Sequence, residues 1–245
     1  MRRLLARGRQ VSTVELAERF GVSPMTVRRD LGALAEAGVA LRCYGGAVSA
    51  QRITFEFAFD ERRRRRLTQK RRIGAEAASR VQPEQVVFVD TGTTTLELAR
   101  VLVRLGVACK VVTSSLVIAS ELWGSERVEL TLVGGRVRRG SPDLVGPGTE
   151  VMLDRLTADV AFLGSDGIDP ARGSFAADVE AARVAERMVA NARHIVVLAD
   201  SSKLGLPGAA RYARIEQIDE LITDRNAERG LVRELRSRGV RVTLV

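Results

Sequence analysis

In the stretch "VVFVDTGTTTLELA", residues 86–99, an apolar run typical of a strand is followed by an aspartate, a glycine and four threonines. Aspartic proteases use Asp-Thr-Gly after an apolar strand, some kinases use Asp-x-Gly-Thr-Thr for nucleotide phosphate, and phosphate-binding loops begin helices in this way. Leu96, Ala99 and Val103 fall on one side of a helix predicted over 95–105. The protease motif lies among strands and the kinase loop returns to a strand, so a strand–loop–helix context favours the third interpretation.

Apolar runs alternate with helical patterns through the rest of the chain. Their lengths and flanking residues predict strands over 86–90, 110–114, 128–133, 159–164, 194–200, 220–223 and 240–245, and helices over 70–81, 95–105, 115–123, 149–156, 178–192 and 225–238. Continuous Val, Ile and Leu runs separated by helices indicate a mostly parallel sheet covered on both faces. The predicted fold class is therefore α/β, with ligands at the carboxyl ends of the strands.

The loop after the first of these strands has the chemistry of an anion site. Gly92 removes side-chain bulk, and we expect the amides and hydroxyls of Thr93, Thr94 and Thr95 to converge where the next helix begins. Partial positive charge at a helix N-terminus favours an anion, and a phosphoryl group fits best. The alternative is that the threonines only cap the helix, but capping needs one threonine and not four.

Polar residues also follow other predicted strands. Ser114 ends the second strand, Asp166 follows the fourth, and Asp178 and Glu180 open a predicted helix, where Asp178 could instead be only a helix cap. Lys203 follows the fifth strand and is one of 3 lysines beside 36 arginines. A compact ammonium in that position suits phosphate binding or sugar chemistry.

The first fifty residues contain "VSTVELAERFGVSPMTVRRDLGALAEAGV", which predicts two short helices and a tight turn. Ser12 with Glu15 fits a capping box, and Gly21 suits a left-handed helix end. In the first helix Val14, Ala17 and Phe20 are expected on one side, and the second begins with Ser23 as its N-cap and Pro24 at its first position. Its apolar stripe is made by the residues Val27, Leu31 and Leu34.

The functional interpretation of this segment is a winged helix-turn-helix, whose second helix enters the major groove of DNA. After Gly38, "VALRCYGGAV" predicts two short strands that meet at Gly45 and Gly46 and form the wing. An ordinary helical hairpin with a solvated Arg-Arg pair is the alternative. We predict DNA contacts from Ser23, Met25, Thr26, Arg28, Arg29, Arg42 and Tyr44.

Positive charge is concentrated in the first third of the chain. Residues 1–60 carry +3, residues 61–72 carry +7 and residues 73–245 carry −1. This asymmetry indicates a nucleic-acid-binding end on a near-neutral body. We predict a DNA-binding domain over 1–50, a linker over 51–72 and a sensor domain over 73–245. The alternating Ile53, Phe55, Phe57 and Phe59 are expected to pack the linker on the body. The arginines at 62–66 are expected to be a solvated helix start, with contact to DNA phosphates as the alternative.

Composition excludes several protein classes. No apolar run approaches the ~20 residues of a membrane span, and the N-terminus lacks the features of a signal peptide. Cys43 and Cys109 have neither metal-ligand spacing nor a disulfide framework. We expect a cytoplasmic protein with no membrane partner, no metal and no cofactor.

The chain resembles the DeoR family of bacterial transcriptional regulators. At the N-terminus the resemblance lies in "VSTVELAERFGVSPMTVRRDL" and "YGGAV", where Tyr44 replaces the histidine usual in the family. Further on it lies in "DTGTTTLELA", "VVTSSLVIA", "LVGGRVR", "LVGP", "AFLGSDGID" and "VVLADSSKLG", so it covers nearly the whole chain.

The resemblance implies a sensor domain like that of ribose-5-phosphate isomerase or CoA-transferase, which binds a phosphorylated sugar without converting it. Carried over by position, the residues that hold the phosphate or sugar hydroxyls are Asp90, Thr91, Gly92, Thr93, Thr94 and Thr95, and those around the sugar are Ser114, Asp166, Asp178, Glu180 and Lys203. The family commonly has asparagine in place of Ser114.

The expected function is a repressor of a carbohydrate-utilisation operon, not an enzyme. It binds operator double-stranded DNA as a homo-oligomer, a dimer or tetramer, and a sugar phosphate releases it. The alternative is a sugar-phosphate isomerase with an accessory DNA-binding domain, since Asp166, Asp178, Glu180 and Lys203 could imitate an acid–base set.

Overall fold

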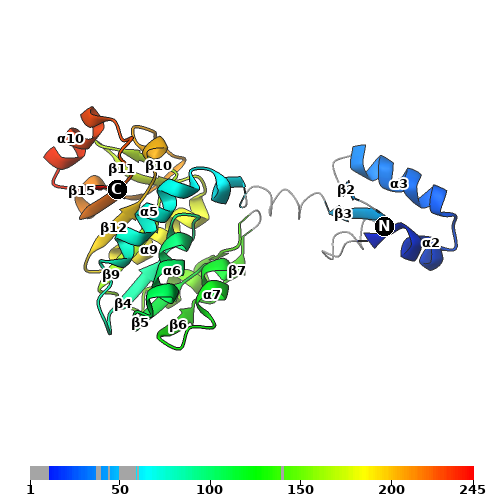
Figure 1. Ribbon diagram of the computed structural model, residues 1–245, viewed down its shortest axis with the longest axis horizontal. Coiled ribbons are helices and arrows are strands. Elements are labelled where there is room, and N and C mark those ends of the chain that lie inside the picture. The colour runs from blue at the N-terminus through cyan, green and yellow to red at the C-terminus, as the bar shows by residue number, and fades with distance from the viewer. Residues whose placement is uncertain (1–10, 37–39, 44, 50–58, 60, 139–140) are drawn as a thin grey trace. The chain divides into compact units, whose positions relative to one another are not determined.

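The computed structural model describes residues 11–36, 40–43, 45–49, 59, 61–138 and 141–245 (Figure 1). These residues form two compact units, one that comprises the described residues up to Arg62 together with Ser141 and one that comprises 63–138 and 142–245. We call the first the N-terminal unit and the second the sensor unit. In the described part of the chain, no helix has the length and apolar character needed to cross a lipid bilayer.

The described residues of the N-terminal unit include the helices α2 and α3 and a small antiparallel sheet. Its elements are β1 (Val11–Ser12), α2 (Thr13–Phe20), α3 (Pro24–Glu36), β2 (Ala40–Cys43) and β3 (Gly46–Ser49), with the strand order β1-β3-β2. Both predicted helices and the wing are confirmed, while β1 was not predicted. Gly46 is required there, because a Cβ would overlap the carbonyl oxygen of Val11 on the neighbouring strand.

Local hydrogen bonds set the helix boundaries of this unit. The Ser12 hydroxyl accepts from the amide of Val14 at 3.2 Å, Gly21 ends α2 with φ +62°, and the Ser23 hydroxyl accepts from the amide of Thr26 at 3.1 Å. The predicted capping box is wrong, because Ser12 caps Val14 and the Glu15 side chain makes no return bond.

The buried face of α2 also differs from the prediction. Val14 and Phe20 are 59% and 46% exposed, whereas Thr13, Leu16 and Ala17 are buried. Leu16 and Ala17 lie in the same core cluster as Val27 and Leu31 of α3, where the predicted stripe is confirmed. Two apolar stripes are available on α2, and the position of α3 and the sheet decides which one is buried.

The sensor unit is built on a seven-stranded sheet in which every pairing is parallel. All seven predicted strands are confirmed. In spatial order they are β15 (Arg241–Leu244), β14 (Glu220–Thr223), β12 (Ile195–Leu198), β9 (Val160–Gly164), β4 (Val86–Val89), β5 (Cys109–Thr113) and β6 (Val128–Leu132).

All six predicted helices of the body are present. They are α5 (Leu67–Ala78), α6 (Thr95–Leu105), α7 (Leu116–Leu122), α8 (Pro147–Leu153), α9 (Val179–Ala190) and α10 (Arg229–Ser237). From β4 the chain winds outward through β5 to β6, and from β9 it winds the other way through β12 and β14 to β15. Because parallel crossovers are right-handed, α6 and α7 cover one face of the sheet and α9 and α10 the other.

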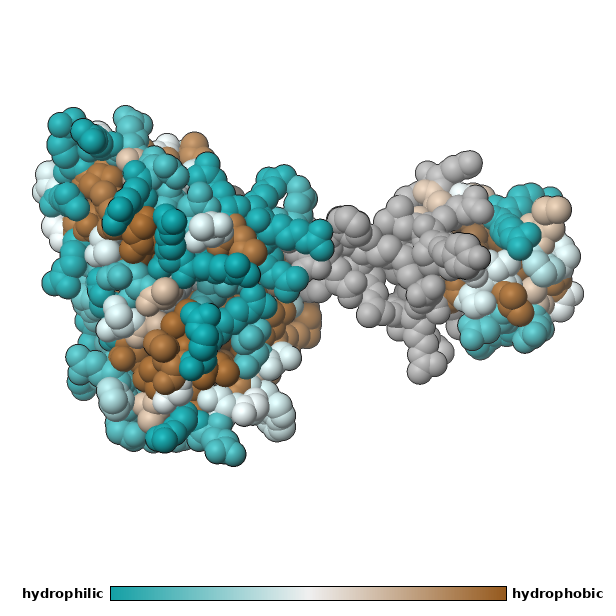
Figure 2. Space-filling model, viewed as in Figure 1, coloured by the Kyte–Doolittle hydropathy of each residue, from teal (hydrophilic) through white to brown (hydrophobic). Residues whose placement is uncertain are grey.

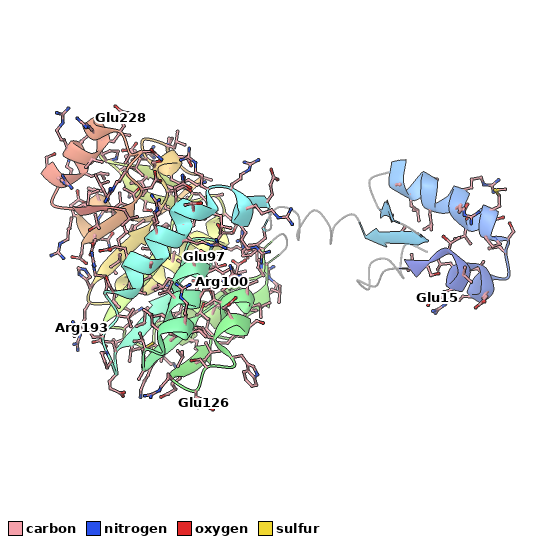
Figure 3. The ribbon with its side chains drawn as sticks, in the orientation of Figure 1. Glu15, Glu97, Arg100, Glu126, Arg193 and Glu228 are labelled. Carbon is pink, nitrogen blue, oxygen red and sulfur yellow. The ribbon has the colours of Figure 1, made fainter. Side chains whose placement is uncertain are left out.

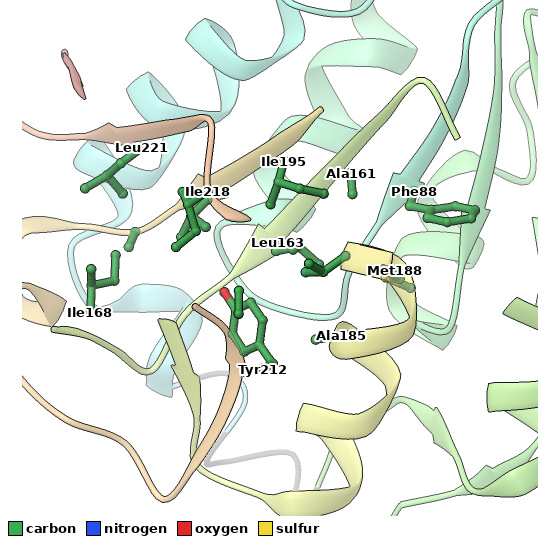
Figure 4. Packing of buried hydrophobic residues seen from close by; sticks show 14 of the residues in the cluster. Phe88, Ala161, Leu163, Ile168, Ala185, Met188, Ile195, Tyr212, Ile218 and Leu221 are labelled. Carbon is green, nitrogen blue, oxygen red and sulfur yellow. The ribbon is translucent and has the colours of Figure 1, made fainter. Parts of the chain in front are cut away.

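The core lies between this sheet and the helices of the α9 face (Figure 4). Phe88 of β4 and Leu163 of β9 are fully buried with Met188 of α9. On the α6 face, Gly74 lets α5 approach α6 closely, since a Cβ there would lie 2.7 Å from the backbone of Glu97.

Two smaller sheets of the sensor unit were not predicted. Strands β10 (Gly167–Asp169), β11 (Gly173–Ala176) and β13 (Ala210–Ala213) form an antiparallel sheet, and β7 (Arg136–Val137) pairs with β8 (Leu144–Val145). These strands have two to four residues and include glycine, serine and arginine, so they show no periodic apolar signal. The described residues of the sensor unit also form the 3-10 turns η1 (Ser201–Lys203) and η2 (Ile215–Gln217).

Candidate functional site

The candidate effector site lies at the carboxyl edge of the parallel sheet. The direction of winding reverses between β4 and β9, which are direct neighbours. Ligands of open α/β sheets bind at such a reversal, where the loops from adjacent strands leave toward opposite faces. The residues at this point are the 90–95 loop after β4 and the Gly164–Asp166 segment, which begins with the last residue of β9.

The 90–95 loop leads into α6 as predicted. Thr94 occupies the N-cap position without a side-chain capping bond, and no described residue is hydrogen-bonded to the hydroxyl of Thr93. Thr95 behaves differently, because its fully buried hydroxyl donates to the carbonyl of Gly92 at 3.1 Å. Thr95 therefore shapes the loop, while Thr93 and Thr94 keep hydroxyls that can bind a guest at the helix N-terminus.

Asp90 is the buried carboxyl group of this loop. The amide of Gly164 donates to its Oδ2 at 3.2 Å, which joins the ends of β4 and β9. Burial raises the pKa of Asp90 to about 7, against the opposing effect of the Thr91 and Gly164 amides, and the charges of Asp143 and Asp166 raise it further. Asp90 can therefore donate or accept a hydrogen bond near neutral pH.

Ser114 directly follows β5, the neighbour of β4 on the side away from β9. Its side chain is 1% exposed, and its Oγ has no hydrogen-bond partner within the described part of the chain. Its backbone carbonyl is occupied, because it accepts from the amide of Leu144 at 2.8 Å. A buried hydroxyl without a partner is unfavourable by ~1–3 kcal/mol, so this group is suited to a ligand or a bound water.

Asp166 lies beside a hydroxyl chain at the end of β9. Its Oδ2 accepts from the amide of Ala177 at 2.9 Å, which ties β9 to the segment before α9. Tyr212 of β13 donates to the carbonyl of Gly164 at 2.6 Å, and Ser174 of β11 lies 2.7 Å from the Tyr212 hydroxyl. Burial raises the pKa of Tyr212, so it remains a neutral donor at this edge.

Asp178 and Glu180 contact the β7–β8 hairpin. Asp178 caps α9, since its Oδ1 accepts from the amides of Glu180 and Ala181 at 3.0 Å each. Glu180 forms an ion pair with Arg136, which raises the pKa of that guanidinium. Arg138 makes two bonds to the buried Asp143, at 3.0 and 3.2 Å, and its Nη1 lies 3.7 Å from Asp178. Both predicted carboxylates therefore have cationic neighbours.

Lys203 lies at the end of η1, on the turn after β12. It is partly exposed, and no described residue forms an ion pair with it. Residues 200–203 follow the carboxyl end of β12, which pairs with β9. The ammonium is thus on the same edge of the sheet as Asp90 and Ser114 and is free to bind an anion.

The candidate DNA surface lies on α3. Met25 is 73% exposed, Arg28 and Arg29 are exposed, and Val27 between them points into the core. Ser23 and Thr26 share a local bond of 3.0 Å between their hydroxyls at the start of this helix. Arg42 lies in β2, but its side chain is outside the described part, and so is the whole of Tyr44.

Comparison with known families decides what these two units are. The DeoR C-terminal sensor domain matches residues 65–225, and the DeoR-like helix-turn-helix domain matches residues 1–52. The chain belongs to the DeoR family. It is a DNA-binding transcriptional regulator with a sensor domain, as the resemblance implied, and this family assignment excludes the isomerase alternative.

Curated relatives of this DeoR-family regulator match it over most of their length. The HTH-type transcriptional regulator GlpR of Haloferax volcanii is 37% identical, over 96% of this chain and 91% of the relative. A putative aga operon transcriptional repressor of Escherichia coli O157:H7 is 34% identical, over 99% and 91%. The glycerol-3-phosphate regulon repressor of Escherichia coli K12 is 31% identical, over 87% and 84%.

Among solved structures, ribose 5-phosphate isomerase A from Methanocaldococcus jannaschii is similar to part of the regulator. It aligns with 55% of this chain and 53% of its own at a TM-score of 0.42 and 20% identity, a likeness too low to bear on function. In the described part of the regulator, no group of three His, Cys, Asp or Glu side chains is placed to hold a metal ion.

The structure adds residues to this site that the sequence did not single out. Tyr212 belongs to the unpredicted antiparallel sheet, and nothing in its local sequence connects it with β9. Arg136 and Arg138 could not be identified as site residues from the sequence. Because 36 of the 39 Lys and Arg residues are arginine, the presence of an arginine at one position does not indicate a binding role. Asp143 could be found only through its bonds to Arg138.

Proposed function

We propose that this DeoR-family regulator represses a carbohydrate-utilisation operon and that a phosphorylated sugar releases it from operator DNA. The phosphate binds at the start of α6, to the amides and hydroxyls of Thr93 and Thr94, with the ammonium of Lys203 as its counter-charge. Ser114, Asp90 and Asp166 bind sugar hydroxyls. Asp178 and Glu180 lie around the sugar, where Arg138 and Arg136 hold them.

The observation that carries this proposal is the unpartnered Ser114 hydroxyl at the carboxyl edge of the sheet, one strand away from the winding reversal. Buried polar groups nearly always have a hydrogen-bond partner, and this unpartnered one directly follows β5, the strand that pairs with β4 and therefore lies beside the start of the Asp90 loop. The relatives named for the aga operon and the glycerol-3-phosphate regulon support the same class of effector. The effector residues and the boundaries 1–50, 51–72 and 73–245 are part of this proposal.

The DNA-binding half of the proposal uses α3 as the recognition helix. Met25, Arg28 and Arg29 read base edges, Ser23 and Thr26 approach the backbone, and the wing with Arg42 and Tyr44 contacts phosphates. Contacts to bases give selectivity, whereas the phosphate contacts make binding depend on salt. The arginines at 62–65 add to this dependence on salt.

Ser114→Ala tests the effector site, with Ser115→Ala as the matched control. Ser114→Ala removes an unsatisfied buried hydroxyl, so it should raise the free energy of unfolding by ~1 kcal/mol while weakening effector binding about fivefold or more. Ser115 caps α7 by accepting from the amide of Ile118 at 3.2 Å, so Ser115→Ala should destabilise by ~1 kcal/mol without affecting effector binding.

The measurements are urea unfolding and calorimetric titration of the full chain with glycerol 3-phosphate, ribose 5-phosphate and fructose 6-phosphate. At 100 times its dissociation constant, a bound compound should stabilise the folded protein by ~2.7 kcal/mol. If Ser114→Ala bound the effector with unchanged affinity, the effector site would not lie at the end of β5. Turnover of any of the three compounds would contradict the assignment as a regulator.

We further propose that the regulator is a cytoplasmic homo-oligomer, a dimer or tetramer. Helix-turn-helix proteins read paired half-sites as dimers. Leu105 at the end of α6 and Trp123 after α7 are 63% and 85% exposed, and Figure 2 shows hydrophobic surface in the region of α6. Light scattering tests this directly, because a solution mass of 26.7 kDa at micromolar concentration would contradict it.

A further inference from the structure

Arg66 lies near the start of the sensor unit, where it is the N-cap residue of α5. It is the last of the five arginines at 62–66 and lies four residues beyond the end of the N-terminal unit. Its φ is +53°, and among the described residues only Glu84, with φ +67°, is another non-glycine residue with positive φ. Such a backbone persists only where surrounding contacts hold it, and these positions often lie in switch regions.

The side chain of Arg66 is bound to the turn that carries Lys203. Its Nη1 donates to the Ser201 hydroxyl at 3.1 Å, and its Nε lies 3.5 Å from Oδ1 of Asp200. The Asp200 carboxylate is almost fully buried and also accepts from the amide of Ser202 at 3.1 Å. Arg66 and the η1 turn therefore share one carboxylate, so a shift of the turn must change the Arg66 contact.

The backbone of Arg66 is connected to the other side of the candidate site through contacts between α5 and α6. Its carbonyl accepts from the amide of Lys70 at 3.1 Å, which is the first hydrogen bond of α5. Helix α5 packs against α6, where Gly74 meets the backbone of Glu97 and Arg71 lies 3.8 Å from the Glu97 carboxylate. Figure 3 shows Glu97 and Arg100 in the region of these helices. The first turn of α6 holds Thr94 and Thr95.

We propose that Arg66 is a positioning residue that transmits effector binding to the N-terminal unit. An anion held by Lys203 at the start of α6 shifts the Asp200–Lys203 turn and releases the Arg66 side chain. The left-handed backbone of Arg66 then relaxes, and the direction in which the preceding chain enters α5 changes. This inference rests on the proposed function, because it requires an anionic effector beside Lys203.

The experiment measures the coupling factor, which is the ratio of effector affinities without and with bound DNA. The DNA is a duplex selected from a random library by the wild-type full chain, and the probes are glycerol 3-phosphate, ribose 5-phosphate and fructose 6-phosphate. The variants are Arg66→Gly, Arg66→Lys and Glu84→Gly. Glycine adopts positive φ without strain, so Arg66→Gly keeps the backbone and removes only the side chain.

Coupling in wild type should lie in the range typical of allosteric proteins, ~5–150-fold. Arg66→Gly should bring it to less than about twofold while DNA and effector affinities, each measured alone, stay within about threefold of wild type. Arg66→Lys keeps the charge but loses the guanidinium geometry, so an intermediate factor is expected. Glu84→Gly relieves the same kind of backbone strain away from the carboxyl edge and should leave coupling unchanged.

Three outcomes would overturn the inference while leaving the proposed function in place. Wild-type coupling in both Arg66 variants would mean that communication runs elsewhere, and an equal loss in Glu84→Gly would attribute the effect to general backbone relaxation. Loss of effector binding itself in Arg66→Gly would make Arg66 part of the binding site. A wild-type chain that binds its selected DNA but responds to none of the probes would instead refute the proposed function, and this inference with it.

Discussion

Replacing Asp90 by asparagine tests the electrostatics of the candidate effector site. Burial raises the pKa of Asp90 from an ordinary value of 3.8 to about 7, and Asp143 and Asp166 add to the effect. The asparagine side chain could still accept from the amide of Gly164, so Asp90→Asn removes a charge and keeps a hydrogen bond. The expected consequence is a gain in stability that depends on pH.

The sign of that dependence follows from proton binding. Below pH 4 the carboxyl group is protonated in both the folded and the unfolded chain. Between pH 4 and 7 the folded chain keeps a proton that the unfolded chain has lost, so the free energy of unfolding falls as pH rises. This interval spans roughly three pH units at 1.36 kcal/mol each, which gives an upper value of ~4 kcal/mol. The free energy of unfolding of Asp90→Asn should therefore be closer to that of wild type at pH 5 than at pH 8. At pH 8 the variant should be the more stable protein, by up to ~4 kcal/mol.

Urea unfolding followed by tryptophan fluorescence provides the assay. Trp123 is the only tryptophan and lies in the sensor unit, so its signal reports the unfolding of that unit. Asp169→Asn is the control, because Asp169 binds the amides of Ala171 and Arg172 in an exposed turn, and its effect should be small and similar at both pH values. A difference between Asp90→Asn and wild type that is equal at pH 5 and pH 8 would refute the reasoning.

Three further predictions address DNA reading, the anion site and helix packing. Replacing Arg28 and Arg29 together by alanine should abolish discrimination between selected and random DNA in a gel-shift assay, while the circular dichroism spectrum stays unchanged. If discrimination were retained, α3 would not be the recognition helix. Thr94→Asp places a carboxylate where the phosphate is expected, so operator binding should persist but no longer respond to sugar phosphates. If calorimetry gave the wild-type affinity for sugar phosphates, the phosphate would bind elsewhere. Gly74→Ala should lower the free energy of unfolding by ~1–3 kcal/mol, because its Cβ would lie 2.7 Å from the backbone of α6. Gly32→Ala, at a helical glycine with open space around it, should be neutral or stabilising by ~0.5–1 kcal/mol, and a similar loss in both variants would contradict the packing argument.

Much of the sensor fold could be predicted because its signals are local. Each of the seven strands of the parallel sheet is a short apolar run, and burial on both faces makes such runs visible without knowledge of their partners. The boundaries of α6 at Thr95 and Leu105 also follow from local chemistry, a threonine-rich start and Gly106 with φ +63° at the end. For the same reason the turn between α2 and α3 could be located from Gly21 and Ser23.

The predicted packing of Ile53, Phe55, Phe57 and Phe59 on the body concerns residues that lie mostly outside the described part of the chain. Phe59 is buried, whereas residues 53–58 lie outside the described part of the chain, so the packing of this linker stays a prediction. Helix α5 begins at Leu67, inside the segment predicted as linker, and the family match to the sensor domain begins at residue 65. Local periodicity could not reveal this, because the arginines before Leu67 give no apolar pattern.

The strand–helix alternation, the helix-turn-helix and the hydroxyl-rich loop can be predicted from sequence, since each depends on neighbours within a few residues. The tertiary structure sets which strands are adjacent, and so it brings Asp90 to the amide of Gly164 and the Tyr212 hydroxyl to the carbonyl of the same glycine. It also joined Arg66 to Ser201, 135 residues away. The physical reason is that periodicity records which face of an element is buried, whereas the group that covers that face depends on the order in which the strands pair.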